Sequence, residues 1–499
     1  MKRLLERHGL PLLAALCIGL TLLAAVLWYL QLKADVALLF HSDSDYLPAL
    51  YHDLVEQGGR LSQWNLTPAP SFLPDWPLFF LARWAAGDFF HALPAYFVLQ
   101  GLLLFALMLW LARALIDARQ ALATASCATV LVFYWAMHAI SPYIYFYLSA
   151  FHCGVFLLLL LSLRLEFRQS CWLLGGVAML AALSDRLYLL QYTLPAVLTL
   201  AALHWRQRLP WKRQALAIVL GSLIGVRLYR LVAHALTLPW MMSLDAVALN
   251  LPQLGRILDE TWHYAPACLA LLMMYYLVLS ALLAGALLGR GWRLRQPLAA
   301  RLALFNWLSM AGTLAAVLLS ANTPTVRYFI PAYVLPLLVA PVLLYTSLPQ
   351  HWHRHLTAAL LLCAVWLTQS MLLPVLRDLG ATQRTYYPPQ VACMDGAIAQ
   401  YGLQYGMSNY WDAKRFGMLS RHPRMIAPYT KELEPMHWIT SESVFRRSYD
   451  FVLVGHGQEL DVLDAGTLIR QNGAPAARID CGTFDLLAYP GGGLKNGFR

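Results

Sequence analysis

The sequence contains few charged residues for its length. Of its 499 residues only 13% are Asp, Glu, Lys or Arg, whereas 59% are hydrophobic. A soluble protein would carry charge on about a quarter of its residues. The scarcity of charge therefore argues against a soluble domain as the fold of the whole chain.

Several catalytic and metal-binding signatures are also missing. The sequence has no G-x-S-x-G, Walker or dinucleotide-binding motif. None of its eight cysteines forms a C-x-x-C pair or the His/Cys spacing of a zinc site. These absences argue against a structural metal and leave the function to be inferred from the distribution of apolar and charged residues.

The apolar residues occur in runs of about 20, the length needed to cross a hydrocarbon core of roughly 30 Å. The first run follows a basic start and lacks a small-residue cleavage site, so we interpret it as a retained helix and not as a signal peptide. We therefore expect an all-α membrane domain with about eleven transmembrane helices. The expected spans are 10–30, 94–114, 121–140, 148–164, 170–184, 187–205, 214–236, 264–289, 301–320, 328–347 and 356–376.

The net charge of +11 comes from short basic clusters between these runs. The clusters are Arg113/Arg119, Arg164/Arg168, Arg206/Arg208/Lys212/Arg213, Arg290/Arg293/Arg295/Arg301 and Arg354. Each follows an even-numbered run, whereas the turns at 141–152, 237–262 and 321–326 are nearly free of Lys and Arg. This positive-inside pattern predicts a cytoplasmic N-terminus and an external C-terminus, with membrane lipids and no nucleic acid as partners.

Two domains are expected. Residues 1–376 form the membrane domain, with a long first external loop at 33–93, and residues 377–499 form an external α/β domain. The loop sequence HSDSDYLPALYHDLVEQGG predicts an amphipathic helix that ends at Gly58–Gly59 and lies in the membrane interface, followed by a short apolar helix at 77–86. In the C-terminal domain we expect helices near 389–401 and 410–420 and strands at RMIAPY, FVLVG, ARIDC and FDLLAY.

Two acidic residues, Asp43 and Asp45, follow the first apolar run at i and i+2. Such a pair beside apolar surroundings can hold a divalent metal ion, or one carboxylate with a raised pKa can act as a general base. The same residues also fit a solvated helix N-terminus with Asp43 as the N-cap.

The seventh run contains Arg227, Arg230 and His234 at i, i+3 and i+7, so they share one helix face. Arginines inside an apolar run point to a polar cavity or an anionic ligand, because the guanidinium grips phosphate oxygens in a bidentate manner. The alternative is that they snorkel to the external interface or pair with Asp185.

Arg327 and Tyr328 open the tenth run, in SANTPTVRYFIPAYVLP. Arg327 is a strong cation in an otherwise uncharged external turn, where the charge rule does not place one. We therefore expect it to face a ligand, with interfacial anchoring as the alternative.

Further polar residues lie at the external ends of the runs. His138 and His152 fit a ligand site or a satisfied core position, and Asp75 in LPDWP also fits a turn. Asp185–Arg186 joins two short runs, so the hairpin tip is expected in a polar cavity below the membrane surface. Cys393 and Cys481 both fall in the external domain, where a disulfide is permitted, and two buried free thiols are the alternative.

Together these features resemble the GT-C membrane glycosyltransferases, which include protein O-mannosyltransferases and the aminoarabinose transferases of lipid A. The resemblance rests on the first-loop motif DSDYLPALYHDLVEQG with PLFFLARW after it, on the late VRYFIPAYVLPLL, and on an external C-terminal domain. The chain has DSD where many members have Asp-Glu or Glu-x-Asp, so the resemblance does not choose between Asp43 and Asp45.

The resemblance implies an inverting glycosyltransferase of the bacterial cytoplasmic membrane. It would move a sugar from a polyprenyl-phosphate donor to a cell-envelope acceptor on the external face. Asp43 or Asp45 would be the base, with a divalent metal there as the one cofactor considered. The donor phosphate would be held by Arg327, Tyr328, Arg227 and Arg230, and the cavity lined by Asp75, His152, Asp185, Arg186 and His234. Aromatic residues of YGLQYGMSNYWDAKRFG would stack on sugar rings. The rival hypotheses are a transporter or flippase and a non-catalytic protein that binds a lipid-linked sugar.

Overall fold

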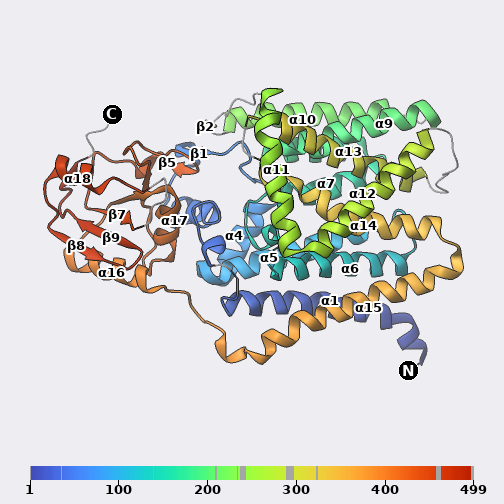
Figure 1. The fold of residues 1–499 in the computed structure, drawn as a ribbon, viewed down its shortest axis with the longest axis horizontal. Coiled ribbons are helices and arrows are strands. Elements are labelled where there is room, and N and C mark those ends of the chain that lie inside the picture. Colours follow the sequence, from blue (N-terminus) through green and yellow to red (C-terminus); the bar gives the residue numbers. More distant parts are fainter. Residues whose placement is uncertain are drawn as a thin grey trace.

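A computed structural model shows a bundle of long helices with a small α/β domain at one end (Figure 1). It describes residues 2–34, 36–138, 140–207, 211–232, 234–235, 243–287, 297–321, 324–456 and 462–495. The N-terminus lies at the end of the bundle that is remote from the α/β domain (Figure 1). The chain thus runs through the bundle before it enters that domain.

Eight helices in the described part of the chain are long and apolar enough to cross a membrane, which is consistent with a multi-pass membrane protein. Their apolar portions are Gly9–Leu30 in α1 (Lys2–Leu30), Phe89–Ala112 (α5), Ala118–Met137 (α6), Lys212–Leu231 in α10 (Lys212–Val232), Pro266–Ala286 in α12 (Pro266–Leu287), Pro297–Leu319 (α13), Val326–Ser347 in η5 (Val326–Phe329) and α14 (Ile330–Ser347), and Gln350–Arg377 (α15).

The expected count of about eleven spans is not confirmed. The runs expected at 148–164, 170–184 and 187–205 fold as α7 (Cys153–Phe167), α8 (Cys171–Ser184) and the pair η4 (Leu189–Thr193) and α9 (Leu194–Gln207). Helices α7, α8 and α9 have 15, 14 and 14 residues. At about 1.5 Å per residue, such helices fall short of a core of roughly 30 Å.

The expectation of a turn at 237–262 is also corrected by the structure. Residues Asp245–Tyr264 form α11, a helix of 20 residues, which runs across the direction of the long helices (Figure 1). Asn250 anchors it, because its side-chain amide donates to the carbonyls of Val317 and Ser320 at the end of α13. A scarcity of Lys and Arg marks a side of the membrane but says nothing about whether the segment is helical.

The first loop lies between the bundle and the C-terminal domain (Figure 1). Its elements are α2 (Val36–Leu39), α3 (Tyr46–Tyr51), the π-turn η1 (His52–Glu56), η2 (Leu61–Gln63), β1 (Trp64–Leu66) and α4 (Asp75–Ala86). The amphipathic helix expected to lie in the membrane interface is instead buried in protein, since Tyr46, Leu47 and Leu50 are at most 2% exposed. Its apolar stripe is covered by neighbouring elements, including α17 (Tyr410–Leu419) of the C-terminal domain.

The C-terminal domain contains a five-stranded sheet in the order β4-β3-β7-β9-β8. The strands are β3 (Gly406–Asn409), β4 (Ala427–Tyr429), β7 (Phe451–Gly455), β8 (Ala477–Asp480) and β9 (Phe484–Ala488). The helices are α16 (Pro389–Tyr401), α17 and α18 (Ala465–Asn472), and η6 (Leu379–Ala381) and η7 (Glu442–Val444) are 3₁₀ turns. Helix α16 ends at Gly402, whose φ of 64° is a conformation that glycine adopts at no steric cost. The four expected strands are present, and β3 was not predicted.

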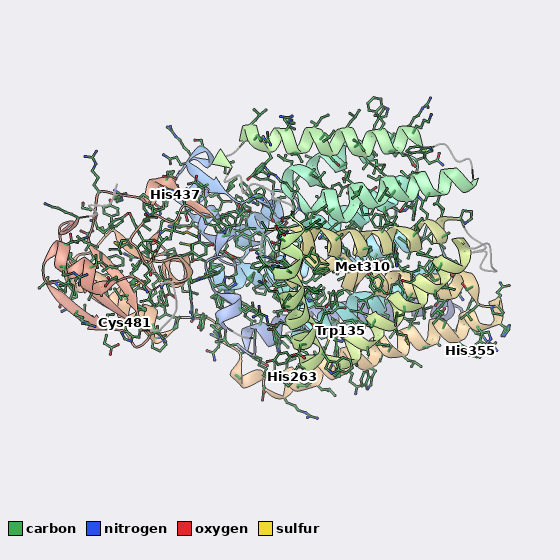
Figure 2. All side chains as sticks on the ribbon, turned by 45° about the horizontal axis from the view of Figure 1, so that its top comes forward. Trp135, His263, Met310, His355, His437 and Cys481 are labelled. Atoms are coloured by element: carbon green, nitrogen blue, oxygen red, sulfur yellow. A yellow bond between two sulfur atoms is a disulfide. The ribbon has the colours of Figure 1, made fainter. Side chains whose placement is uncertain are left out.

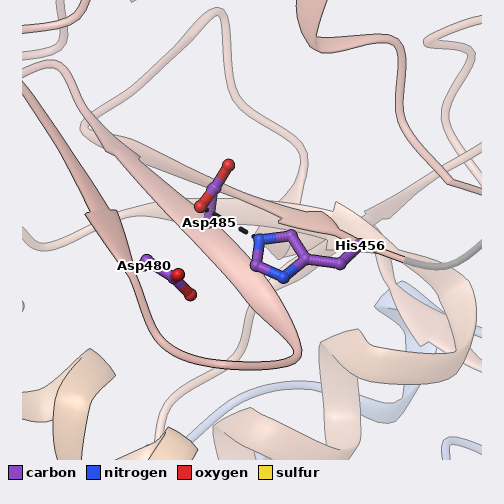
Figure 3. A group of neighbouring side chains, drawn as sticks. All are labelled: His456, Asp480 and Asp485. Atoms are coloured by element: carbon purple, nitrogen blue, oxygen red, sulfur yellow. Dashed lines mark ion pairs between the residues drawn. The ribbon is translucent and has the colours of Figure 1, made fainter.

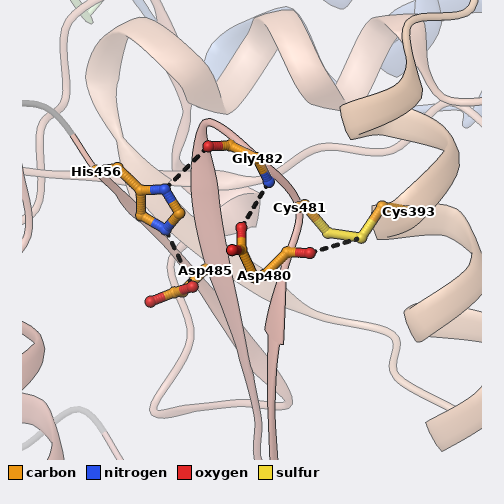
Figure 4. Close-up of a disulfide and its surroundings, with 6 residues drawn as sticks. All are labelled: Cys393, His456, Asp480, Cys481, Gly482 and Asp485. Carbon is orange, nitrogen blue, oxygen red and sulfur yellow. Dashed lines mark hydrogen bonds and ion pairs between the residues drawn. A yellow bond between two sulfur atoms is a disulfide. The ribbon is translucent and has the colours of Figure 1, made fainter.

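Backbone pairing joins this domain to the bundle. Strand β1 of the first loop pairs with β5 (Thr440–Ser441) on one side and with β2 (His234–Ala235) on the other. A second small sheet joins β6 (Ser448–Tyr449) to β10 (Leu494–Lys495). A disulfide connects Cys393 of α16 to Cys481 after β8 (Figure 4). Three segments far apart in sequence thus meet at β1, where the candidate site lies.

Candidate functional site

A cavity of about 320 Å³ lies where the first loop, the bundle and the C-terminal domain meet. Its charged and aromatic polar lining comes from the first loop and from turns at the ends of bundle helices. These residues are Asp43, His152, Asp185, Arg186, Arg327 and Tyr328. Its apolar lining includes Leu187 from the turn before η4, Leu190 from η4, and Ala316 and Val317 from the end of α13. Trp438 and Ile439 of the C-terminal domain complete the wall.

Asp43 is held from two sides. Its Oδ1 accepts a hydrogen bond of 2.5 Å from the hydroxyl of Tyr410, the first residue of α17. Its Oδ2 lies 3.9 Å from Nη1 of Arg327, and its side chain remains 21% exposed. A carboxylate that is oriented by one hydrogen bond and a nearby cation and still faces a cavity is placed to accept a proton from a bound hydroxyl.

Arg327 projects from the 3₁₀ turn η5 between Asp43 and aromatic rings. Its guanidinium carbon lies 5.6 Å from the centroid of Phe151. Its Nε is buried and has no hydrogen-bond partner within the described residues. The arginine therefore retains donors for an anionic ligand.

Arg186 is a second arginine on the cavity wall. Its guanidinium carbon stacks 4.6 Å from the ring of Tyr229, whose hydroxyl donates to the carbonyl oxygen of Thr67 at 2.6 Å. Both Nε and Nη2 of Arg186 are buried and unpartnered among the described residues. A buried donor without a partner costs free energy, so it commonly marks a place where a ligand or ordered water binds.

His152 and Asp185 form an ion-pair contact beside this arginine. Nδ1 of His152 lies 2.5 Å from Oδ2 of Asp185, and Oδ1 of Asp185 accepts from the backbone N–H of Leu187 at 2.9 Å. His152 has a φ of 65°, an uncommon conformation for a residue other than glycine that occurs often at functional sites. The pair fixes the turn that presents Arg186.

Asp45 lies behind Asp43, fully buried, with both carboxylate oxygens unpartnered among the described residues. Burial raises its pKa well above the ordinary value, and the cations of Arg415 and Lys414 act in the opposite direction. Lys414 is also buried, without a hydrogen-bond partner for its Nζ in the described structure, and burial lowers its pKa to about 8. These two cations oppose a divalent metal at Asp43 and Asp45, so the donor set does not fit the metal and we derive no step through it.

Six of the residues singled out in the sequence line the cavity, and the others lie elsewhere. Asp75 is buried away from it, where it accepts from the hydroxyl of Tyr96, and burial raises its pKa to about 6. It packs against Gly154 at the start of α7 and so supports the turn that carries His152. His138 is exposed and bonds to its own helix through the carbonyl oxygen of Tyr134.

Arg227 and Arg230 share one face of α10 as predicted, but that face is exposed and does not line the cavity. Helix α10 turns the opposite face to α8, because Gly221 and Gly225 pack so closely against it that a Cβ at either position would overlap α8 backbone. The small-residue spacing Gly-x-x-x-Gly is the signal that could have shown this orientation. His234 contributes its backbone to β2, and its side chain lies outside the described residues.

Sequence analysis assigned no role to Lys414 or Trp438, and it included Tyr410 only as one aromatic residue in a longer run. Tyr410 lies 367 positions from the carboxylate that it contacts. No periodicity or local motif spans such a distance. The run YWDAKRFG that contains Tyr410 and Lys414 was the available signal, since it places two aromatic residues and then two basic residues on a short helix.

A second polar group lies on the C-terminal domain, far from the cavity. His456, Asp480 and Asp485 have potential ligand atoms within 4.8 Å of one another (Figure 3). These atoms are already paired: His456 contacts Asp485 at 3.0 Å through Nε2 and the carbonyl oxygen of Gly482 at 3.0 Å through Nδ1 (Figure 4). Arg478 donates to Asp485 at 2.8 Å. The group is therefore a satisfied ion-pair network that tightens the turn beside the disulfide.

Comparison with known proteins finds no matching family model and no similar curated protein. The assignment of function therefore rests on the cavity and on the resemblance noted in the sequence.

Proposed function

We propose that this protein is a membrane glycosyltransferase that moves a sugar from a polyprenyl-phosphate donor to an acceptor hydroxyl. The observation that carries the proposal is that Asp43, Arg327 and Arg186 line one cavity whose remaining wall is largely apolar. A base, two arginines and an apolar wall suit the deprotonation of an alcohol beside a lipid phosphate.

The lining favours an amphiphilic anion as one ligand. Leu187, Leu190 and Val317 lie at the ends of apolar helices, where the chain of a lipid can enter from the membrane. Arg186 and Arg327 line the same cavity, and each has a buried N–H group without a partner among the described residues. A polyprenyl phosphate carries both an apolar chain and a phosphate, so it matches both features.

The chemistry follows from the positions of the charged groups. Asp43 accepts the proton of the acceptor hydroxyl while that oxygen attacks the anomeric carbon of the donor sugar. The bond from the anomeric carbon to the phosphate oxygen breaks, and the phosphate leaves with the electron pair. Arg327 stabilises the charge that develops on the phosphate. Attack opposite to the leaving group inverts the anomeric centre.

We further propose that the protein lies in the bacterial cytoplasmic membrane, with its N-terminus in the cytoplasm and the C-terminal domain on the external face. The basic clusters support this orientation. His355, next to Arg354, lies at the end of the bundle opposite to Cys481 of the C-terminal domain (Figure 2). The positive-inside rule places the basic end in the cytoplasm.

The decisive experiment compares Asp43→Asn with the wild type in a reconstituted system. We expect turnover with polyprenyl-phosphate-linked sugars to fall by about 10²–10⁴-fold, because general base catalysis is lost. Binding of undecaprenyl phosphate, measured by thermal shift, should be retained. Asp259→Asn, at an exposed position of α11, is the matched control.

Two outcomes would contradict the proposal. If undecaprenyl phosphate neither binds to the wild type nor stabilises it, the proposed lipid donor is wrong. Binding of the lipid without any transfer, in wild type and variant alike, would identify a flippase or a non-catalytic lipid-binding protein.

A further inference from the structure

One wall of the cavity is supplied by the C-terminal domain, through Trp438 and Ile439. They belong to the segment that connects β4 to β5, next to His437, which Figure 2 shows where the C-terminal domain meets the bundle. Trp438 is partly buried, and among the described side chains no aromatic ring or cation stacks on its indole. Trp438 packs against the hydrophobic core and also lines the cavity, so an aromatic residue is available at this wall.

The segment is fixed to the first loop. Residues Thr440 and Ser441 pair with β1, and the amide of Asn65 donates to the carboxylate of Glu442. Glu442 also contacts Nδ1 of His437 at 2.7 Å. Trp438 thus stands between two anchored residues, so its position is defined before a ligand arrives, which lowers the entropic cost of binding.

Trp438 and the proposed base both line the cavity where the C-terminal domain borders it. Asp43 accepts a hydrogen bond from Tyr410 of α17, and Trp438 belongs to the same domain as α17. The apolar residues Leu190, Ala316 and Val317 come from the helices of the bundle. The lipid donor therefore approaches from the bundle, and the molecule that presents a hydroxyl to Asp43 approaches beside Trp438.

We propose that the acceptor is a carbohydrate and that its pyranose ring stacks on Trp438. The apolar C–H face of a pyranose matches the face of an indole, while its hydroxyls project from the edge of the ring toward Asp43. The inference rests on the proposed glycosyl transfer and goes beyond it, because it names the acceptor class and the residue that selects it. It also moves the stacking role from the run 401–417 to Trp438.

The test measures carbohydrate binding directly. Purified protein is titrated with a panel of methyl pyranosides, and contacts are detected by saturation-transfer NMR. Trp438→Ala should weaken binding roughly tenfold, while Trp438→Phe, which retains an aromatic face, should weaken it less. Trp84→Ala, at a residue 75% exposed on α4, is the control and should bind as the wild type does.

The outcomes separate this inference from the proposed function. Equal pyranoside binding in wild type and Trp438→Ala would overturn the role of Trp438, and transfer to a serine or threonine peptide with no pyranoside binding would overturn the acceptor class. Neither result affects lipid-phosphate binding or the defect of Asp43→Asn. Conversely, pyranoside binding that depends on Trp438 in a protein without transferase activity would retain the carbohydrate site and reject the glycosyltransferase.

Discussion

Two groups of charges, near opposite ends of the same helices, differ in how closely a carboxylate pairs with each arginine. Helix α7 begins beside the cavity and carries Glu166 near its other end, where Glu166 is 1% exposed. Arg301 forms an ion pair with that carboxylate, and Tyr192 donates to it at 2.8 Å. At the cavity, Arg186 stacks on Tyr229 and forms no ion pair among the described residues, and Arg327 lies 3.9 Å from Asp43. The Nε atom is buried and unpartnered in Arg186, Arg327 and Arg301 alike.

Under the proposed function, the difference separates charges that serve the fold from charges that serve a ligand. A buried ion pair in close contact holds helices together, and its disruption leaves an uncompensated charge. A partly buried cation without a carboxylate in close contact reduces the stability of the ligand-free protein, so its retention requires another reason. The anion that we propose as a ligand would supply that reason at the cavity.

The largest effect is expected when the paired group is broken. Arg301→Ala leaves Glu166 buried without its cation and should destabilise the protein by about 3–5 kcal/mol. Thermal unfolding in detergent measures this loss, with the exposed Arg354→Ala as the control. An unchanged unfolding temperature in Arg301→Ala would contradict the claim that the Arg301–Glu166 ion pair stabilises the fold.

A somewhat smaller effect, on binding, is expected at Arg327. Arg327→Ala should weaken binding of undecaprenyl phosphate by about 2–5 kcal/mol if the phosphate is buried there. Arg327→Lys keeps the charge but loses the bidentate grip, so its defect should be partial. The affinity of each purified variant checks this, and equal affinity in wild type and Arg327→Ala would make the arginine an interfacial anchor.

Substitution of Arg186 should affect ligand binding but not the stability of the ligand-free protein. Arg186→Met removes two unpartnered donors, so we expect little change in the unfolding temperature of the ligand-free protein. The stabilisation by undecaprenyl phosphate should weaken, by about tenfold in apparent affinity for a contact worth about 1.4 kcal/mol. A large loss of stability without ligand would place Arg186 with Arg301 among the structural charges.

The smallest effect is expected in the paired network of the C-terminal domain. Asp485 raises the pKa of His456 above its ordinary value of 6.5. Because the folded pKa exceeds the unfolded one, the protonated pair stabilises the domain fully below the unfolded pKa, and this contribution is lost as pH rises through the folded pKa. Hydrogen exchange in β8 and β9 should quicken over that range and lose this pH dependence in His456→Gln, whereas His351→Gln should behave as the wild type.

The sequence predicted the helices and strands better than their contacts with one another. The apolar runs that became α1, α5, α6 and five later helices were identified because length and hydropathy are local properties. Four strands of the C-terminal five-stranded sheet followed from short β-branched and aromatic runs, whereas β3 did not. The count of about eleven spans is not confirmed, since a run of apolar residues does not reveal where a helix is interrupted.

For the site, the sequence by itself determined which side chains were unusual where they stood: Asp43 after the first run, Arg327 in a turn poor in charge, and Asp185–Arg186 between two short runs. Only the tertiary structure decided which of them share a cavity. The helix face that carries Arg227 and Arg230 points away from α8, because the glycines on the opposite face of α10 pack on α8. The tertiary structure also brought Tyr410 and Trp438 to the first loop. These decisions depend on contacts between segments tens to hundreds of positions apart, such as Gly221 against Gly175 and Tyr410 against Asp43. The free energy of those contacts is set by packing, which no local pattern encodes.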